Sequence, residues 1–234
     1  MIGIIGAMDV EIENLRSELA GANMRELCGF TFYTGKMQGR DVAVVKCGIG
    51  KVNAARCAQL LIDSFCPEVI INTGIAGALA DDLDVGDVII SERLVQYDVD
   101  GTGLGYAKGY LFTGISPDEP TYFRADERVM GALLSSAKKI AADRKVRCGT
   151  IATADIFVSS SVLKNRIHDE FEADVAEMEG AAIAQTAQYA GIPFAVLRTT
   201  SDKADGSADV DMASFGKEAS DLAAAIIRDF VSTF

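Results

Sequence analysis

The chain has 234 residues, of which 49% are hydrophobic, and a formal net charge of −12 from 22 basic and 34 acidic residues. Its length and the lack of linkers, repeats or low-complexity tracts favour one α/β domain over residues 1–234. The acidic balance argues against a nucleic-acid partner, which would need a basic face.

Apolar strands and amphipathic helices alternate along the first half of the chain. The expected strands and helices are Ile2–Gly6, Asp9–Leu19, Phe30–Met37, Asp41–Lys46, Gly50–Phe65, Val69–Asn72 and strand within Val85–Val99. In the second helix the apolar face is expected at Val52, Ala55, Leu60 and Leu61. The TGIAG stretch after Asn72 is expected to form a tight turn.

The second half begins with a long loop, Asp100–Tyr122, a length typical of a lid, a binding loop or an interface element. The elements expected after it are Ala125–Ala142, Val146–Ala152, Ser161–Phe171, Asp174–Met178, Gly180–Ala190, Ile192–Thr200 and Asp211–Phe234. The alternation predicts an α/β fold, a three-layer α/β/α sandwich around a twisted mixed β-sheet.

The cysteines and the N-terminal residues bear on location. The odd set of five contains no C-x-x-C pair and fits a reduced, cytoplasmic protein; it comprises Cys28, Cys47, Cys57, Cys66 and Cys148. The first apolar run is too short, and too soon acidic, for a signal peptide. No apolar stretch is long enough to span a bilayer, so no membrane partner is expected.

Four strand ends carry unusual residues, and two of them lie in the first half of the chain. In GAMDVEIENL, Glu11 and Glu13 begin a helix, where each carboxylate would stabilise the helix dipole by about 0.3–1 kcal/mol. The Gly-rich NTGIAG stretch could present backbone N–H groups to an anion or a polarised water, or could simply be a turn.

The other two strand ends are AEMEGAAIA and RTTSDKAD. Strand alternation places Glu177 and Glu179 on one side, with Met178 opposite, and two solvated charges are the alternative interpretation. Arg198 and Asp202 follow a buried strand, where ligands of open α/β sheets bind. The alternative for this stretch is a helix cap or surface loop with Arg198 and Asp202 paired.

Several common sites are excluded by spacing. The GIGK stretch is not a P-loop, and GTGLG at Gly101–Gly105 lies in a loop and breaks the dinucleotide rule. The single histidine, His168, sits in a charged helix that should be at the surface, which disfavours Ser-His and Cys-His catalysis. No His/Cys cluster indicates a metal site.

The stretches IGIIGAMDVE, GIGKVNAA, INTGIAGAL, DVGDVIIS, TADIFV, AEMEGAAIA and RTTSDKAD together cover almost the whole chain. In this combination the chain resembles the 5′-methylthioadenosine/S-adenosylhomocysteine nucleosidases, the hydrolase branch of the nucleoside phosphorylase superfamily. The resemblance implies a nucleoside phosphorylase-like fold and hydrolysis of the N-glycosidic bond of both nucleosides, releasing adenine and the 5-thioribose product. It implies no metal or organic cofactor, a role in methionine salvage, and a homodimer whose Leu104–Tyr106 region lies near the partner's pocket.

The resemblance also implies a role for each site residue. Glu11 matches the carboxylate that activates the water, and Asp202 the general acid at adenine N7. Glu179 matches the residue that binds the ribose hydroxyls, Ser201 the support of the acid and the base, and Arg198 an arginine near the water. The remaining matches are Phe157, which stacks on adenine, Val158, whose backbone reads the adenine edge, and the apolar walls Met8, Ile49 and Met178.

The chain departs from the family pattern at three places. Ile75 stands where many members have a serine, so a contact there must come from the backbone or be absent. Met212 replaces an aromatic residue that often covers the substrate, and it can fill the same apolar space. The Gly109–Tyr122 loop looks longer than in compact members. Asp205 is expected to be a structural loop residue.

Three other functions stay open on the residues alone: a purine nucleoside phosphorylase, a futalosine-type nucleoside hydrolase and a nucleoside-binding module without turnover. Glu11 favours water over phosphate, since a carboxylate at the nucleophile site would repel a phosphate dianion. A binding module would not need an acid at N7.

Overall fold

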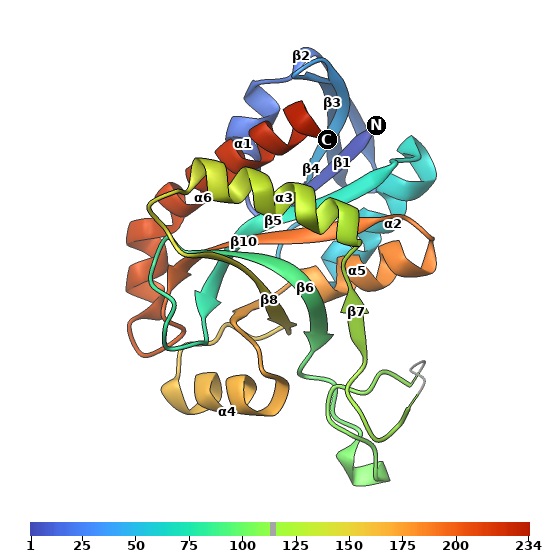
Figure 1. Cartoon of the computed structure of the whole chain (residues 1–234). Coiled ribbons are helices and arrows are strands. Elements are labelled where there is room, and N and C mark those ends of the chain that lie inside the picture. The colour runs from blue at the N-terminus through green and yellow to red at the C-terminus, as the bar shows by residue number, and fades with distance from the viewer. Residues whose placement is uncertain (113–115) are drawn as a thin grey trace.

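In the computed structural model, which describes residues 1–112 and 116–234, ten strands form one mixed sheet through the middle of the molecule (Figure 1). Their bounds are β1 Ile2–Gly6, β2 Ala20–Leu27, β3 Phe30–Met37, β4 Arg40–Lys46, β5 Val69–Ala78, β6 Val88–Gln96, β7 Tyr122–Arg124, β8 Val146–Thr153, β9 Val175–Glu177 and β10 Phe194–Asp202.

Strand β5 is the centre of this sheet. On one side it pairs with β1, which leads through β4 and β3 to the edge strand β2. On the other side it pairs with both β9 and β10, and these continue through β8 and β6 until the pairings close a ring. The sheet is therefore open at the β2 end and closed like a small barrel beyond β5.

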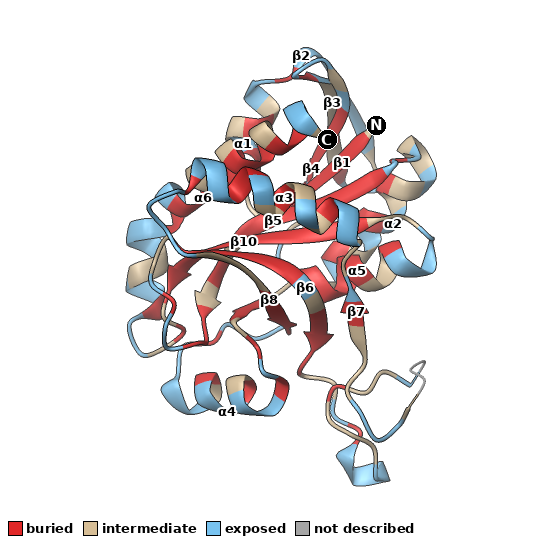
Figure 2. Cartoon of the chain, viewed as in Figure 1, coloured by how far each residue is buried: buried red, intermediate tan, exposed pale blue. Residues whose placement is uncertain are grey.

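Helices cover both faces of the sheet. On one face lie α1 (Asp9–Ser17), α3 (Glu127–Ile140) and α6 (Ala208–Thr233), and on the other α2 (Lys51–Phe65) and α5 (Gly180–Tyr189). The shorter α4 (Ser161–Phe171) packs beside β8. Figure 2 shows buried strands and outward helix faces that are exposed. The predicted three-layer α/β/α sandwich is confirmed.

Alternation in β1 shows how the sequence produces this layering. Every residue of β1 is buried; Ile2 and Ile4 pack into the core beneath α1 and α6, whereas Ile5 packs into the core beneath α2. A strand with apolar residues on both sides requires cover on both sides. No helix in the described part of the chain is long and apolar enough to cross a membrane.

A prediction about β5 was wrong, and one about α2 was right only in part. The TGIAG stretch is not a turn, since β5 continues to Ala78 and Thr73–Gly77 pairs with β10. In α2, Leu61 is buried as predicted, but Val52 is 70% exposed, and the other buried residues are Ala54, Cys57 and Ala58. The glycines suggested a turn, but Gly74 and Gly77 lie within the strand and leave space for neighbouring side chains.

The remaining differences concern ends and edges. Strand β2 was not predicted, because it is an exposed edge with a mainly polar sequence. Strand β10 runs on to Asp202, so Ser201 and Asp202 belong to a buried strand and not to a polar loop. Most of the predicted long loop is irregular, with a 3₁₀ turn at Thr102–Leu104, and residues 113–115 of it lie outside the described residues.

Candidate active site

A cavity of about 370 Å³ opens at the end of β5, β9 and β10. It brings together most of the residues predicted from sequence: Met8, Glu11, Ile49, Ile75, Phe157, Met178, Glu179, Ser201, Asp202 and Met212. Its other lining residues are Ala7, Ala76, Gly77, Ala176 and Glu177. Val158 lines a small adjoining cavity of about 30 Å³, and Arg198 is buried and lines neither.

Glu11 lies in the first turn of α1, and its side chain turns back to the backbone N–H groups at the ends of β1 and β5. Its carboxylate accepts hydrogen bonds from the backbone N–H groups of Ala7 (2.6 Å), Met8 (3.0 Å) and Ile75 (3.0 Å). Burial raises the pKa of Glu11, while Arg198 and the three N–H donors oppose that shift. The structure thus gives Glu11 more than a helix-dipole role, which fits its exposed neighbour Glu13 better.

Asp202 ends β10 on the same cavity. Its carboxyl accepts from the Ala204 N–H (2.8 Å) and from the Ser201 hydroxyl (2.8 Å). Burial raises its pKa above the usual aspartate value, and these two donors oppose that shift. A carboxyl that holds its proton more firmly than usual and opens onto a cavity is suited to general acid catalysis.

Glycines of β5 make room for both carboxyls. A Cβ atom on Gly74 would lie 2.5 Å from Glu11 Oε1, and one on Gly77 would lie 2.8 Å from Asp202 Oδ1. Any side chain at these positions would displace the carboxyl. Gly74 and Gly77 of the NTGIAG sequence therefore leave space for the carboxyls of Glu11 and Asp202, a role that we did not predict.

Glu177 and Glu179 are both buried, which rules out the interpretation as two solvated charges. Arg198 forms an ion pair with the Glu177 carboxylate and lies 3.9 Å from Glu179, and so it is not paired with Asp202. Met178 was predicted to point away from the two glutamates but lines the same cavity, because β9 ends at Glu177 and the strand alternation stops there.

The N-terminus of α2 holds Glu179 from the opposite side. The Gly50 N–H donates to Glu179 Oε1 (2.8 Å), and the Lys51 N–H donates to the Asp155 carboxylate (2.8 Å). Gly50 has φ +100°, and a Cβ atom there would meet Asp155 at 2.9 Å, so both backbone angle and space require glycine. Lys51 Nζ is fixed by Asp98 at 2.6 Å.

Met8, Ile49 and Met178, which are expected to be apolar wall residues, lie on the cavity together with Phe157 and Met212. Ile49 is 52% exposed and Phe157 43% exposed, so the rim of the cavity is apolar and open in a single chain. Ile75 lines the cavity with its side chain and donates its backbone N–H to the Glu11 carboxylate.

Glu177 is the functional candidate that sequence reasoning left out of the site. The E-M-E spacing singled it out, but only its structure shows that it lines the cavity and binds Arg198. Asn72 supports the same arginine, accepting from Arg198 Nη2 at 2.6 Å. No pattern in the sequence indicated this partnership, because the two residues lie on strands far apart in the chain.

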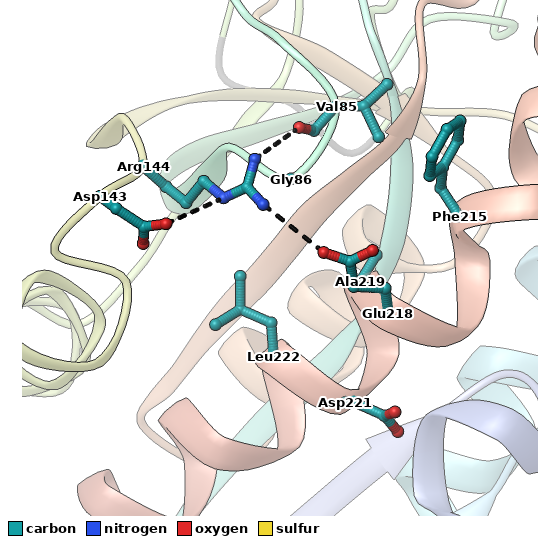
Figure 3. A pocket seen from close by; sticks show the side chains of 9 residues that line it. All are labelled: Val85, Gly86, Asp143, Arg144, Phe215, Glu218, Ala219, Asp221 and Leu222. Carbon is teal, nitrogen blue, oxygen red and sulfur yellow. Dashed lines mark hydrogen bonds and ion pairs between the residues drawn. The ribbon is translucent and has the colours of Figure 1, made fainter.

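A second cavity, of about 540 Å³, lies between α6 and the loops before β6 and β8 (Figure 3). Arg144 points into it and contacts the Val85 carbonyl (3.4 Å), Glu218 (3.5 Å) and Asp143 (3.8 Å). Its acidic side chains are exposed, so it has the character of a solvated surface hollow. Among the described residues, no group of three His, Cys, Asp or Glu side chains could hold a metal ion.

The chain resembles known proteins along almost its whole length. Residues 1–232 match the family model of the phosphorylase superfamily. A 5′-methylthioadenosine/S-adenosylhomocysteine nucleosidase of Staphylococcus haemolyticus is 38% identical over 99% of both chains. The nucleosidase of Neisseria meningitidis, solved with methylthio-immucillin-A, is 36% identical with a TM-score of 0.92, covering 100% of this chain and 99% of that one.

A futalosine hydrolase mutant of Helicobacter pylori is also similar, with 29% identity and a TM-score of 0.91. That alignment covers 100% of this chain and 99% of the other. The fold of this chain is therefore shared with proteins named as futalosine hydrolases as well as with nucleosidases.

Proposed function

The chain belongs to the phosphorylase superfamily and, within it, to the 5′-methylthioadenosine/S-adenosylhomocysteine nucleosidases, and from this membership we propose how its own residues perform the reaction. The proposed reaction is hydrolysis of the N-glycosidic bond of both nucleosides, releasing adenine. The observation that carries it is the meeting of three carboxyls, Glu11, Glu179 and Asp202, on one cavity with apolar walls.

Adenine is a poor leaving group until its N7 accepts a proton. In our proposal Asp202 donates that proton as the C1′–N9 bond breaks, and Ser201 keeps the carboxyl oriented by its 2.8 Å hydrogen bond. The raised pKa of Asp202 supports this role, because the acid must retain its proton until the base is bound. Phe157 and the Val158 backbone would hold the adenine.

The ribose becomes an oxocarbenium-like cation as the base leaves. Glu179 would accept hydrogen bonds from the ribose hydroxyls and place negative charge next to the developing cation. Water would add its oxygen to C1′ from the face opposite adenine and give its proton to Glu11. Three backbone N–H donors fix the Glu11 carboxylate for that task.

Water is the proposed nucleophile because nothing on the cavity wall would attract phosphate. Neither arginine nor lysine lines the cavity among the described residues, and Arg198 is already ion-paired with Glu177. A phosphorylase would need cationic partners for the phosphate dianion.

The test is adenine release from 5′-methylthioadenosine and from S-adenosylhomocysteine in phosphate-free buffer. We expect full activity, free 5-thioribose product and no change on adding phosphate. A requirement for phosphate, with a sugar 1-phosphate as product, would overturn the hydrolase proposal. Hydrolysis of futalosine with no action on the two thioether nucleosides would favour the sibling activity.

We also propose a homodimer in which Leu104–Tyr106 reaches the partner's cavity, a cytoplasmic location and a part in methionine salvage. The apolar, open rim at Ile49 and Phe157 supports the dimer, since exposed apolar side chains around a site favour cover by another chain. Light scattering after size-exclusion chromatography would measure the state directly, and a monomer of 24.8 kDa would contradict it.

A further inference from the structure

Among the described residues, Arg198 is the one guanidinium close to the glutamates around the cavity. It is 1% exposed, and its Nη2 atom contacts both the Glu177 carboxylate and Asn72 Oδ1, while Nη1 donates to the Leu197 carbonyl at 3.0 Å. Glu179 lies 3.9 Å from the same Nη2, beyond hydrogen-bond distance. The Arg198 guanidinium therefore pairs with the Glu177 carboxylate and forms no hydrogen bond with Glu179.

The Glu177 carboxylate accepts four hydrogen bonds. One carboxylate oxygen accepts from the Thr153 hydroxyl, and the other accepts from the N–H groups of Glu179 (3.0 Å) and Gly180 (2.7 Å) as well as from Arg198. These N–H groups begin α5, where the helix dipole also favours negative charge. Glu177 is thus a well-stabilised buried carboxylate.

Glu179 has the opposite surroundings. Among the described residues it receives one hydrogen bond, from the Gly50 N–H, although it is only 5% exposed. The groups that face it are Glu177 from β9, Glu11 from α1, the Cys47 thiol beyond β4, and Arg198 from β10. Burial and the Glu177 charge raise the pKa of Glu179 more than Arg198 lowers it, and the Cys47 thiol stays neutral because burial raises its pKa as well.

We propose that Glu177 is a positioning residue for Glu179: by occupying Arg198, it leaves the Glu179 carboxyl short of donors until the ribose hydroxyls of a substrate supply them. This inference rests on the proposed nucleosidase function and adds a role for a residue that does not itself act on the substrate. Binding of the ribose then ionises Glu179: its carboxyl is neutral in the empty site and is a carboxylate when the ribose hydroxyls donate to it.

The proton balance follows directly. In the ligand-free protein the proton resides on Glu179; when two ribose hydroxyls donate to the carboxylate, that proton passes to the solvent. Binding of a nucleoside therefore releases up to one proton. Affinity should rise about tenfold for each pH unit as the pH approaches the pKa of Glu179 from below, and level off above it.

Calorimetric titration in buffers of different ionisation enthalpy counts this proton. The probe is the 7-deaza analogue of 5′-methylthioadenosine, which keeps the ribose diol but has no N7 for Asp202 to protonate. We expect proton release on binding of this analogue and none on binding of 7-deazaadenine, which lacks the ribose. Wild-type binding of the nucleoside with no proton release would overturn the proposal without any variant.

Glu177→Gln tests the positioning role itself. The amide still accepts from the α5 N–H groups but cannot hold Arg198 by charge, so the guanidinium turns toward Glu179. We expect the pH range over which the affinity for the analogue rises to move down by at least one pH unit. Glu177→Asp keeps the negative charge, so its affinity should depend on pH as in wild type. This second variant shows whether position 177 tolerates substitution if Glu177→Gln fails to fold. Glu13→Gln, at an exposed position, is the matched control and should leave the pH dependence of the affinity unchanged.

The role of Glu177 would be refuted if the affinity of Glu177→Gln depended on pH as in wild type, or if Glu13→Gln showed the same shift. The binding assay needs no turnover, so the two proposals fail separately. Proton release without hydrolysis of 5′-methylthioadenosine would refute the nucleosidase function, whereas hydrolysis without proton release would refute only the inference about Glu177.

Discussion

The carboxyls of the site show how one functional group acquires different tasks from its surroundings. Glu11 accepts three backbone hydrogen bonds, Asp202 accepts one N–H and one hydroxyl, and Glu179 accepts a single N–H. All are buried, and the pKa of each is raised. Donor number and position then distinguish the proposed base, the proposed acid and the proposed sugar ligand, and the sequence alone does not reveal how many donors each carboxyl has.

Replacing the proposed acid or base by its amide tests these assignments. Asp202→Asn and Glu11→Gln should each bind the nucleoside and lose about 10²- to 10⁴-fold in kcat, because neither amide can exchange the required proton. Adenine release and ligand-induced change in Tm measure the two properties. Asp205→Asn is the control, since the Asp205 carboxylate accepts hydrogen bonds from Ser207 and does not line the cavity among the described residues, and it should retain activity. Near wild-type turnover in Asp202→Asn would remove Asp202 from the mechanism.

At the scale of the element, β5 organises the site. It pairs with β1, β9 and β10, and its two glycines leave space for carboxyls that arrive from α1 and β10. Its pairing with β10 places Asp202 opposite Gly77, after a shift in register between Thr200 and Asp202. A strand is a more exact support for catalytic groups than the turn that the glycines suggested.

Gly74→Ala tests the space beside β5. The new methyl group would lie 2.5 Å from Glu11 Oε1 and force the carboxylate to move, so kcat/KM should fall at least tenfold while the protein stays folded. Gly131→Ala on α3 is the control, because nothing lies within 4 Å of its added Cβ. It should retain activity and gain about 0.5–1 kcal/mol in stability. Unchanged kcat/KM in Gly74→Ala would show that the position of Glu11 is not critical.

The sequence predicted elements well where local pattern decides them. Buried strands and amphipathic helices followed from periodicity. The strand-end motifs singled out the carboxyls, and the resemblance to the nucleosidase family supplied most of the other cavity residues. Gly74 was misjudged because it makes room for Glu11, which lies far away in the chain, and the polar β2 was missed because it is a strand only through its pairing with β3.

At the scale of the molecule, buried and exposed acids respond to pH in opposite ways. Glu179 has a folded-state pKa above its unfolded value, so the native state binds more protons between the two values, and this contribution to stability is lost as pH rises through that window. Exposed acids such as Asp82, whose pKa Arg147 and Lys145 lower to about 2, destabilise the protein only when strong acid protonates them.

The ligand-free protein should therefore have a Tm that falls as the pH is raised from about 5 through neutrality. Glu179→Gln removes a group whose ionisation opposes folding, so its Tm should depend less on pH and exceed that of wild type at alkaline pH. Thermal unfolding between pH 5 and 9 measures both, with Glu13→Gln as control. A pH dependence identical in Glu179→Gln and wild type would contradict a raised pKa for Glu179.

The pairing of Arg198 with Asn72 joins residues 126 positions apart, and the cavity wall runs from Ala7 to Met212. Such contacts form only after long loops have closed, which slows their appearance during folding. Only a fragment that spans at least residues 11–202 contains all three of the proposed functional carboxyls, Glu11, Glu179 and Asp202. Turnover is thus a property of the finished native state alone, and partly folded chains in the cell would cleave no nucleoside.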